Sequence, residues 1–153
     1  DGVSYKVDGT AWMDHEWSSS PIDNKHSGWD WFALQLSDGS DLMYYQMRMM
    51  NGDADASSAG MLVTKMGDVT KLTSGEVEVE VLDYWQSPID EVSYPSGWRI
   101  RVPDQDIDLV VEPVMANQEL YGVFRYWEGA VRCNDAETDS PPVCTGYVEL
   151  TGY

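Results

Sequence analysis

The feature that most limits the folds open to this chain is a series of short β-branched and aromatic segments separated by turn residues. From Glu76 to Val81, glutamate and valine alternate strictly. Successive strand side chains point to opposite faces, so this alternation predicts a strand with one buried and one solvated face. The Asp38-Gly39 pair follows another such segment and tolerates the positive φ of a tight hairpin turn. Helical periodicity is nearly absent, so the sequence predicts an all-β sandwich or barrel.

The expected strands follow one another through short turns, which favours an up-and-down antiparallel barrel of roughly nine or ten strands. Such a barrel leaves no open edge and often encloses a ligand cavity. No linker or internal repeat divides the chain, so residues 1–153 are predicted to form a single domain. The predicted strands are Val3–Lys6, Thr10–Trp17, Trp29–Leu36, Leu42–Met50, Gly60–Lys65, Glu76–Tyr84, Trp98–Val102, Ile107–Val111, Tyr121–Cys133 and Thr145–Leu150.

The charge and composition exclude several classes of function. The net charge of −18 at pH 7 repels phosphate backbones, so no nucleic acid is expected as a partner. No apolar run approaches the roughly 20 residues that span a bilayer, so any membrane contact is expected to be peripheral. The chain has two histidines and no closely spaced cysteine pair, so neither a metal nor another cofactor is expected.

The two cysteines, Cys133 and Cys144, lie where strands meet a polar, proline-containing loop. A disulfide that closes this hairpin is the favoured interpretation, and two free thiols are the alternative. In the loop-entropy model such a bridge contributes on the order of 3 kcal/mol. Because disulfides persist in oxidising compartments, the pair predicts a secreted or periplasmic protein.

The segment Leu42–Met50 is predicted to carry two different faces. Tyr44, Gln46 and Arg48 share one face with apolar residues, which is the composition of a cavity wall with a few placed polar groups. The alternative for this face is a solvated strand whose long side chains lie along the surface. The other face combines methionines with Tyr45 and is expected to be core packing.

The segment Gly9–Trp17 places His15 between two acids in aromatic surroundings. His15 is a candidate general acid or base, and the alternative is a core histidine bonded to a carbonyl or carboxylate. Asp14 and Glu16 point to the opposite face of an extended chain and are expected to accept hydrogen bonds from turn amides. His26 lies in a polar loop and is expected to be exposed.

Two glutamates, Glu128 and Glu149, lie in strongly aromatic segments beside Tyr126 and Tyr147. Burial raises the pKa of a carboxyl group, so either glutamate is a candidate acid. The alternative is that each neutralises a structural arginine. The arginines considered for that role are Arg48, Arg101 and Arg125.

Seven sequence blocks, in this order, resemble the hydroxyneurosporene synthase (carotenoid 1,2-hydratase) family, whose members are also described as AttH-like or as predicted secreted hydrolases. The resemblance covers nearly the whole chain and implies a lipocalin-like barrel. The family usually pairs two such barrels, and these motifs belong to the C-terminal half, which implies an N-terminal sister barrel as a partner. The blocks are Gly9–Trp17, Gly28–Gly39, Leu42–Arg48, Trp98–Pro103, Asn117–Leu120, Tyr126–Val131 and Gly146–Tyr153.

The resemblance also implies functional roles for a His-x-Trp pair and a Tyr-x-Asp pair. The first corresponds to His15 and Trp17, and the second falls on Tyr44 and Gln46. Hydration of an alkene needs an acid, and an amide cannot donate a proton in that way at neutral pH. The glutamine therefore separates this chain from the hydratases at the position where the acid is implied.

Two classes of function follow. The first is a barrel that binds a small hydrophobic, isoprenoid- or polyketide-like molecule, or that docks on a sister barrel or a second copy. The second is an enzyme, a hydratase, isomerase or cyclase that uses acid–base chemistry in the barrel lumen. The predicted catalytic residues are His15, Tyr44 and Glu128, and the predicted binding residues are Trp17, Trp31, Gln46, Arg48, Tyr126, Tyr147 and Glu149.

Overall fold

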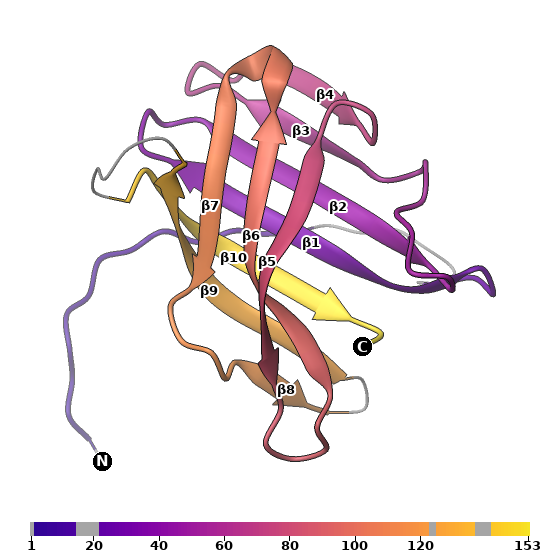
Figure 1. The fold of residues 1–153 in the computed structure, drawn as a ribbon. Coiled ribbons are helices and arrows are strands. Elements are labelled where there is room, and N and C mark those ends of the chain that lie inside the picture. The colour runs from indigo at the N-terminus through magenta and orange to yellow at the C-terminus, as the bar shows by residue number, and fades with distance from the viewer. Residues whose placement is uncertain (1, 15–21, 123–124, 137–141) are drawn as a thin grey trace.

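A computed structural model describes residues 2–14, 22–122, 125–136 and 142–153 (Figure 1). The described chain forms one ten-stranded antiparallel sheet and a single 3₁₀ turn, which confirms the all-β prediction. The elements are β1 (His26–Leu36), β2 (Asp41–Met49), β3 (Ala59–Val63), β4 (Val69–Thr73), β5 (Glu78–Gln86), β6 (Ser93–Val102), η1 (Pro103–Gln105), β7 (Ile107–Pro113), β8 (Glu119–Tyr121), β9 (Arg125–Asp135) and β10 (Cys144–Thr151).

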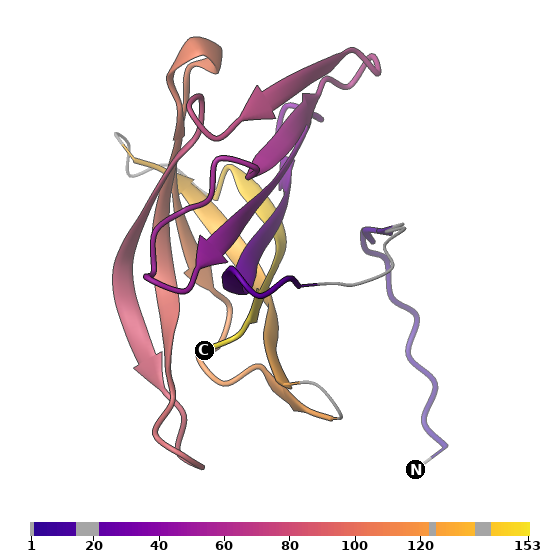
Figure 2. The same cartoon turned by 90° about the vertical axis from the view of Figure 1, so that its right-hand side faces the viewer.

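The sheet curls into a half-barrel. Its strand order is β4-β3-β2-β1-β10-β9-β7-β6-β5, and β8 pairs with β9 outside this path. Figure 2 shows β1 to β4 on one side and β5 to β7 on the other, with β9 and β10 between them. The strand path ends at β4 and β5, so the expectation of a barrel without open edges is wrong for the described residues. The lipocalin-like, up-and-down character of the sheet is confirmed.

The inner face of the curled sheet carries a continuous apolar core. The Phe32 ring on β1 lies edge-on to Trp98 on β6, with 5.7 Å between the ring centroids. Trp98 in turn packs 6.2 Å from Trp127 on β9. All three rings are fully buried, and each contributes on the order of 2–3 kcal/mol through removal of apolar surface from water. The two halves of the sheet are therefore held together by aromatic packing.

Strand β2 shows both faces that its sequence indicates. Leu42 and Tyr44 are buried in the core, so the mixed face points inward. The methionine-rich face points outward and is mostly half-buried, so the expectation that it forms core is wrong. The reason is topological, because β2 belongs to one curled sheet whose inner face holds the core.

The N-terminal part of the chain departs most from the sequence prediction. Residues 2–14 form no strand, although strands over Val3–Lys6 and Thr10–Trp17 were expected. Val3, Tyr5 and Val7 are 64%, 80% and 82% exposed, so their alternation buries no apolar surface. In Figures 1 and 2 this segment runs outside the sheet. A period-two pattern becomes a strand only when a partner edge is available.

Two short strands, β4 and β8, were absent from the prediction. Val69-Thr-Lys-Leu-Thr73 reads as a polar turn region, yet it pairs residue by residue with β3. Glu119–Tyr121 likewise pairs with the first residues of β9. The two strands are only five and three residues long, so backbone pairing with a neighbour decides the structure of each.

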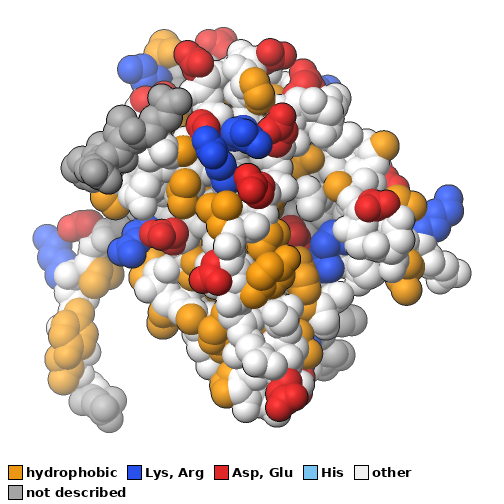
Figure 3. Space-filling view, viewed as in Figure 1, with side chains coloured by type: hydrophobic (Ala, Val, Ile, Leu, Met, Phe, Trp, Pro, Cys, Tyr) orange, Lys and Arg blue, Asp and Glu red, His pale blue; other side chains and the backbone are white. Residues whose placement is uncertain are grey.

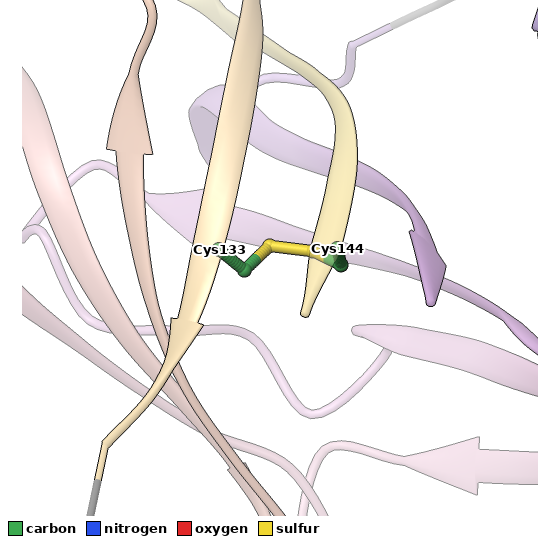
Figure 4. Close-up of a disulfide and its surroundings, with 2 residues drawn as sticks. All are labelled: Cys133 and Cys144. Atoms are coloured by element: carbon green, nitrogen blue, oxygen red, sulfur yellow. A yellow bond between two sulfur atoms is a disulfide. The ribbon is translucent and has the colours of Figure 1, made fainter. Parts of the chain in front are cut away.

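The cysteine prediction is confirmed, because Cys133 and Cys144 form a disulfide (Figure 4). They are directly paired residues of β9 and β10, with 4.8 Å between their Cα atoms. Both half-cystines are buried in the core. The bridge therefore fixes the register of this hairpin from inside the sheet.

His26 is not the exposed loop residue that was expected. It begins β1, and its side chain is only 12% exposed. Its Nδ1 atom lies 2.7 Å from Asp23 Oδ1, and its Nε2 atom lies 3.4 Å from Asp55 Oδ2. The imidazole therefore joins the segment before β1 to the loop that follows β2.

Charged side chains of both signs are interspersed on one face of the molecule. On the face seen in Figure 3, acidic side chains lie among basic and apolar ones and do not gather in one patch. Some are paired across strands, as in the bidentate contact of Arg99 with Asp108 at 2.8 and 2.6 Å. Among the described residues, no helix is long and apolar enough to cross a membrane.

Candidate functional site

A groove of about 780 Å³ lies on the outer face of the sheet. Its floor is formed by β1, β10 and β9, and residues 10–14 of the N-terminal segment form its far wall. This volume falls within the roughly 300–1,000 Å³ of small-molecule sites. The concavity is therefore large enough for a ligand, and it lies outside the barrel lumen in which the sequence predicted a site.

The floor of the groove is low on both sides of Tyr147, because its two cross-strand neighbours are alanines. Ala33 of β1 pairs with Tyr147 of β10, which pairs with Ala130 of β9. Alanines at both ends of this row leave space above the backbone. The groove is thus a consequence of side-chain size on an otherwise regular sheet surface.

Aromatic rings line the groove on two sides. Trp12 of the N-terminal segment meets Trp31 of β1 edge-to-face, with 6.1 Å between centroids. The Trp12 indole Nε1 donates a 3.0 Å hydrogen bond to Asp14, so the carboxylate binds an indole in place of the turn amide that was expected. Tyr147 is 37% exposed and adds a phenol to the lining.

Two carboxylates lie together at one end of the groove. Glu149 of β10 and Glu128 of β9 are directly paired residues, and both line the groove. Glu149 Oε1 accepts a 2.7 Å hydrogen bond from the Trp29 indole. Burial raises the pKa of Tyr147, and the negative charges of Glu128 and Glu149 raise it further. The phenol therefore lies within the field of both acids.

The comparisons with known proteins agree with this fold. The AttH-like family profile matches residues 1–153. The chain belongs to the AttH-like family. A crystal structure of an AttH protein from Nitrosomonas europaea superposes with a TM-score of 0.77 at 32% identity, covering 90% of this chain. This chain spans only 42% of the length of that protein. No curated protein gives a significant match.

A second polar cluster of this AttH-like chain lies on the inner face. Asp30, which is 2% exposed, accepts a 3.0 Å hydrogen bond from Arg48 Nε and bonds of 2.8 and 3.0 Å from the Tyr153 hydroxyl. The Arg48 guanidinium stacks 3.7 Å above the Tyr153 ring and also donates to the carbonyl of Thr151. Burial raises the pKa of Asp30, and Arg48 and Tyr153 oppose this rise. The cluster fastens the C-terminus to β1 and β2.

A third polar cluster links the β5–β6 hairpin to β8 and β9. Arg125 donates to Asp90 and to Glu119, whose side chain is fully buried. Ser87 donates a 2.7 Å hydrogen bond to Glu119, which also accepts one from Tyr121. Because these polar groups bond to one another, we interpret the cluster as a structural link at the end of the half-barrel.

The structure divides the predicted site residues of this AttH-like chain between two faces. Trp31, Glu128, Tyr147 and Glu149 meet in the outer groove, and Tyr126 lies beside it against Trp29. Tyr44, Gln46 and Arg48 belong to the inner face. His15 and Trp17 lie outside the described residues. The predicted catalytic residues Tyr44 and Glu128 are therefore not brought together.

The three arginines considered as partners of Glu128 and Glu149 form ion pairs with other carboxylates. Arg48 pairs with Asp30, Arg101 with Glu78, and Arg125 with Asp90 and Glu119. Among the described residues, no group of three or more His, Cys, Asp or Glu side chains is placed to hold a metal ion. The glutamate pair therefore belongs to the groove.

Sequence reasoning missed the groove residues Trp12, Ala33 and Ala130 and the buried Asp30. Asp30 carried a readable signal, because it alternates with Trp29 and Trp31 and so shares a strand face with the buried Phe32. The two alanines carried no such signal. A small side chain indicates a groove only when the residues beside it on the neighbouring strands are known.

Proposed function

We propose that this chain binds a small hydrophobic molecule in the outer groove. One observation carries the proposal: a concavity of about 780 Å³ whose walls include Trp12, Trp31 and Tyr147 and whose paired glutamates, Glu128 and Glu149, lie at one end. Apolar walls with a few placed polar groups are the usual composition of small-molecule sites. The inner face offers less support, because its space is filled by the aromatic core around Phe32, Trp98 and Trp127.

The test is a titration with N-phenylnaphthylamine, a neutral apolar probe that fluoresces when it leaves water. The protein is expected to bind it saturably. Trp31→Ala removes a wall of the groove and is expected to weaken binding about tenfold, because a large aromatic contact is lost. Tyr84→Ala removes an exposed aromatic side chain from β5, outside the groove, and serves as the matched control. Absence of saturable binding, or equal effects of both variants, would overturn the proposal.

Binding is favoured here over acid–base catalysis. Gln46 stands where the family resemblance implies an acid, and Tyr44 and Glu128 lie on opposite faces of the sheet. Proton transfer requires an acid within hydrogen-bond reach of the reacting atom. The described residues bring together one phenol and three carboxylates in the groove, which suits recognition of a ligand.

A second function, docking of a sister barrel, is favoured by the N-terminal segment. Val3, Tyr5 and Val7 form an exposed apolar face, and such faces mark interaction sites. The matched Nitrosomonas europaea protein extends well beyond the part that this chain covers. The proposed occupant of this face is therefore a second barrel. The disulfide supports placing the protein in a secreted or periplasmic compartment.

A further inference from the structure

We infer that the outer groove selects an uncharged apolar molecule that carries a carbonyl oxygen, such as a ketone or an ester. This inference rests on the proposed function, because it names the chemical class of the molecule that the groove takes. It is carried by three neutral hydrogen-bond donors on the floor of the groove, Tyr147, Trp31 and Gln35.

Tyr147 lies at the centre of the groove floor. Its directly paired neighbours are Ala33 on β1 and Ala130 on β9, and neither alanine side chain is long enough to reach the phenol hydroxyl. The hydroxyl makes no hydrogen bond to any residue that the structure describes. The phenol therefore rises between two small side chains with its donor available to a ligand.

Two further donors flank Tyr147 along β1. Trp31 and Gln35 lie two positions before and after Ala33, so they share its strand face, and both line the groove. Residues in such diagonal positions across a strand pair are about 7–8 Å apart, within reach of aromatic and long side chains. Within the described part of the chain, neither the Trp31 indole N–H nor the Gln35 amide has a hydrogen-bond partner. The floor thus presents neutral donors from three neighbouring positions.

The protonation state of the floor favours an uncharged acceptor. Burial raises the pKa of Tyr147, and the negative charges of Glu128 and Glu149 raise it further, so the phenol keeps its proton at neutral pH. A carbonyl oxygen accepts from such donors through two lone pairs and carries no net charge. A carboxylate would also accept, but Asp14 and Glu128 line the groove, and like charges placed together cost free energy. The described lining includes no lysine or arginine that would offset this repulsion.

The rest of the lining suits an apolar body. Trp12 meets Trp31 edge-to-face, with 6.1 Å between the ring centroids. Val114 and the two alanines of the floor add aliphatic surface. A ketone with an apolar body therefore uses the walls and the floor donors together, whereas a hydrocarbon uses the walls alone.

The experiment compares three competitors that share a naphthalene ring in displacement of N-phenylnaphthylamine. They are 2-acetylnaphthalene, which has a carbonyl oxygen, 2-ethylnaphthalene, which has no such acceptor, and 2-naphthoate, which is an anion. We expect 2-acetylnaphthalene to bind about fivefold more tightly than 2-ethylnaphthalene, because a hydrogen bond is gained, and 2-naphthoate to bind most weakly. Equal affinities of the first two, or a preference for 2-naphthoate, would overturn the inference. Such a result would leave the proposed function standing as long as N-phenylnaphthylamine still binds.

Two variants that each lose one hydroxyl group locate the hydrogen bond. Tyr147→Phe keeps the ring and is expected to weaken 2-acetylnaphthalene binding about fivefold, while 2-ethylnaphthalene affinity changes less than twofold. Tyr84→Phe removes the same group from a 62% exposed position on β5 and is expected to change neither affinity. If Tyr147→Phe leaves the preference for 2-acetylnaphthalene intact, or if both variants reduce it equally, the inference fails. Absence of saturable N-phenylnaphthylamine binding to the unsubstituted protein would instead defeat the proposed function.

Discussion

At the scale of single residues, some positions have no room for a side chain because the backbone of a neighbouring strand lies too close. Gly146 on β10 lies against β1, and a Cβ atom added there would meet the Ala33 carbonyl oxygen at 2.2 Å. The added atom would also lie 2.9 Å from Leu34 Cδ2, on the core side of the sheet. Glycine at this position therefore serves the packing of β10 against β1.

Gly146→Ala is therefore expected to lower the free energy of unfolding by about 1–3 kcal/mol, the usual cost of overpacking. Gly75→Ala is the control, because a Cβ atom there meets nothing within 4 Å. Urea unfolding followed by tryptophan emission measures both. A Gly146→Ala protein as stable as the control variant would show that β1 and β10 are less closely packed than the structure has them.

At the scale of elements, the longer strands followed from the sequence and the marginal ones did not. Strands such as β1, β2 and β9 carry enough aromatic and β-branched residues to be recognised alone. Strand β4 has only five residues, most of them exposed, and its structure comes from pairing with β3. The N-terminal segment shows the opposite error. Its alternating residues predict a strand, yet residues 2–14 do not pair with any strand of the described sheet. Which strands pair with each other depends on residues far apart in the chain, and a local sequence pattern does not contain that information.

The same distinction explains how far the site could be predicted. The sequence predicts Trp31, Tyr147 and Glu149 as binding residues and Glu128 as a catalytic residue, and all four line one groove. Their location on the outer face depends on which strand face the core takes. A shift of one residue in register would have reversed that choice. The sequence identifies the chemistry of the site more readily than the side of the sheet that carries it.

The exposed apolar face of the N-terminal segment supports a prediction about docking. Replacing Val3, Tyr5 and Val7 together by serine is expected to abolish association with a sister barrel and to leave stability unchanged, because these side chains are mostly exposed. Replacing Ser4, Lys6 and Asp8 by alanine alters the other positions of the alternation and serves as the control. Sedimentation velocity of mixtures with the unmatched part of a longer family member measures association. Equal association of both variants would contradict the docking role.

At the scale of the whole molecule, charge opposes compactness. A net charge of −18 on 153 residues produces self-repulsion that favours expansion. Raising NaCl shortens the screening length from about 30 Å at 0.01 M to about 3 Å at 1 M. Salt weakens the repulsion between distant surface carboxylates more than it weakens the attraction within a buried ion pair such as Asp30 and Arg48.

NaCl is therefore expected to raise Tm at pH 7, by about 2–4 °C for each kcal/mol of repulsion that is screened. The increase should shrink near pH 4.1, the sequence pI, where the net charge is small. Differential scanning calorimetry at both pH values measures the effect. A Tm that falls with NaCl at pH 7 would mean that attractive surface pairs, such as Arg99 with Asp108, outweigh the net repulsion.

The most direct test of the proposed site is a crystal structure of the protein with N-phenylnaphthylamine bound. The expected result is probe density in the outer groove, in contact with Trp31 and Tyr147, with the aromatic core unchanged. Probe density on the inner face, between Phe32, Trp98 and Trp127, would contradict the outer-groove site and return the binding function to the barrel lumen.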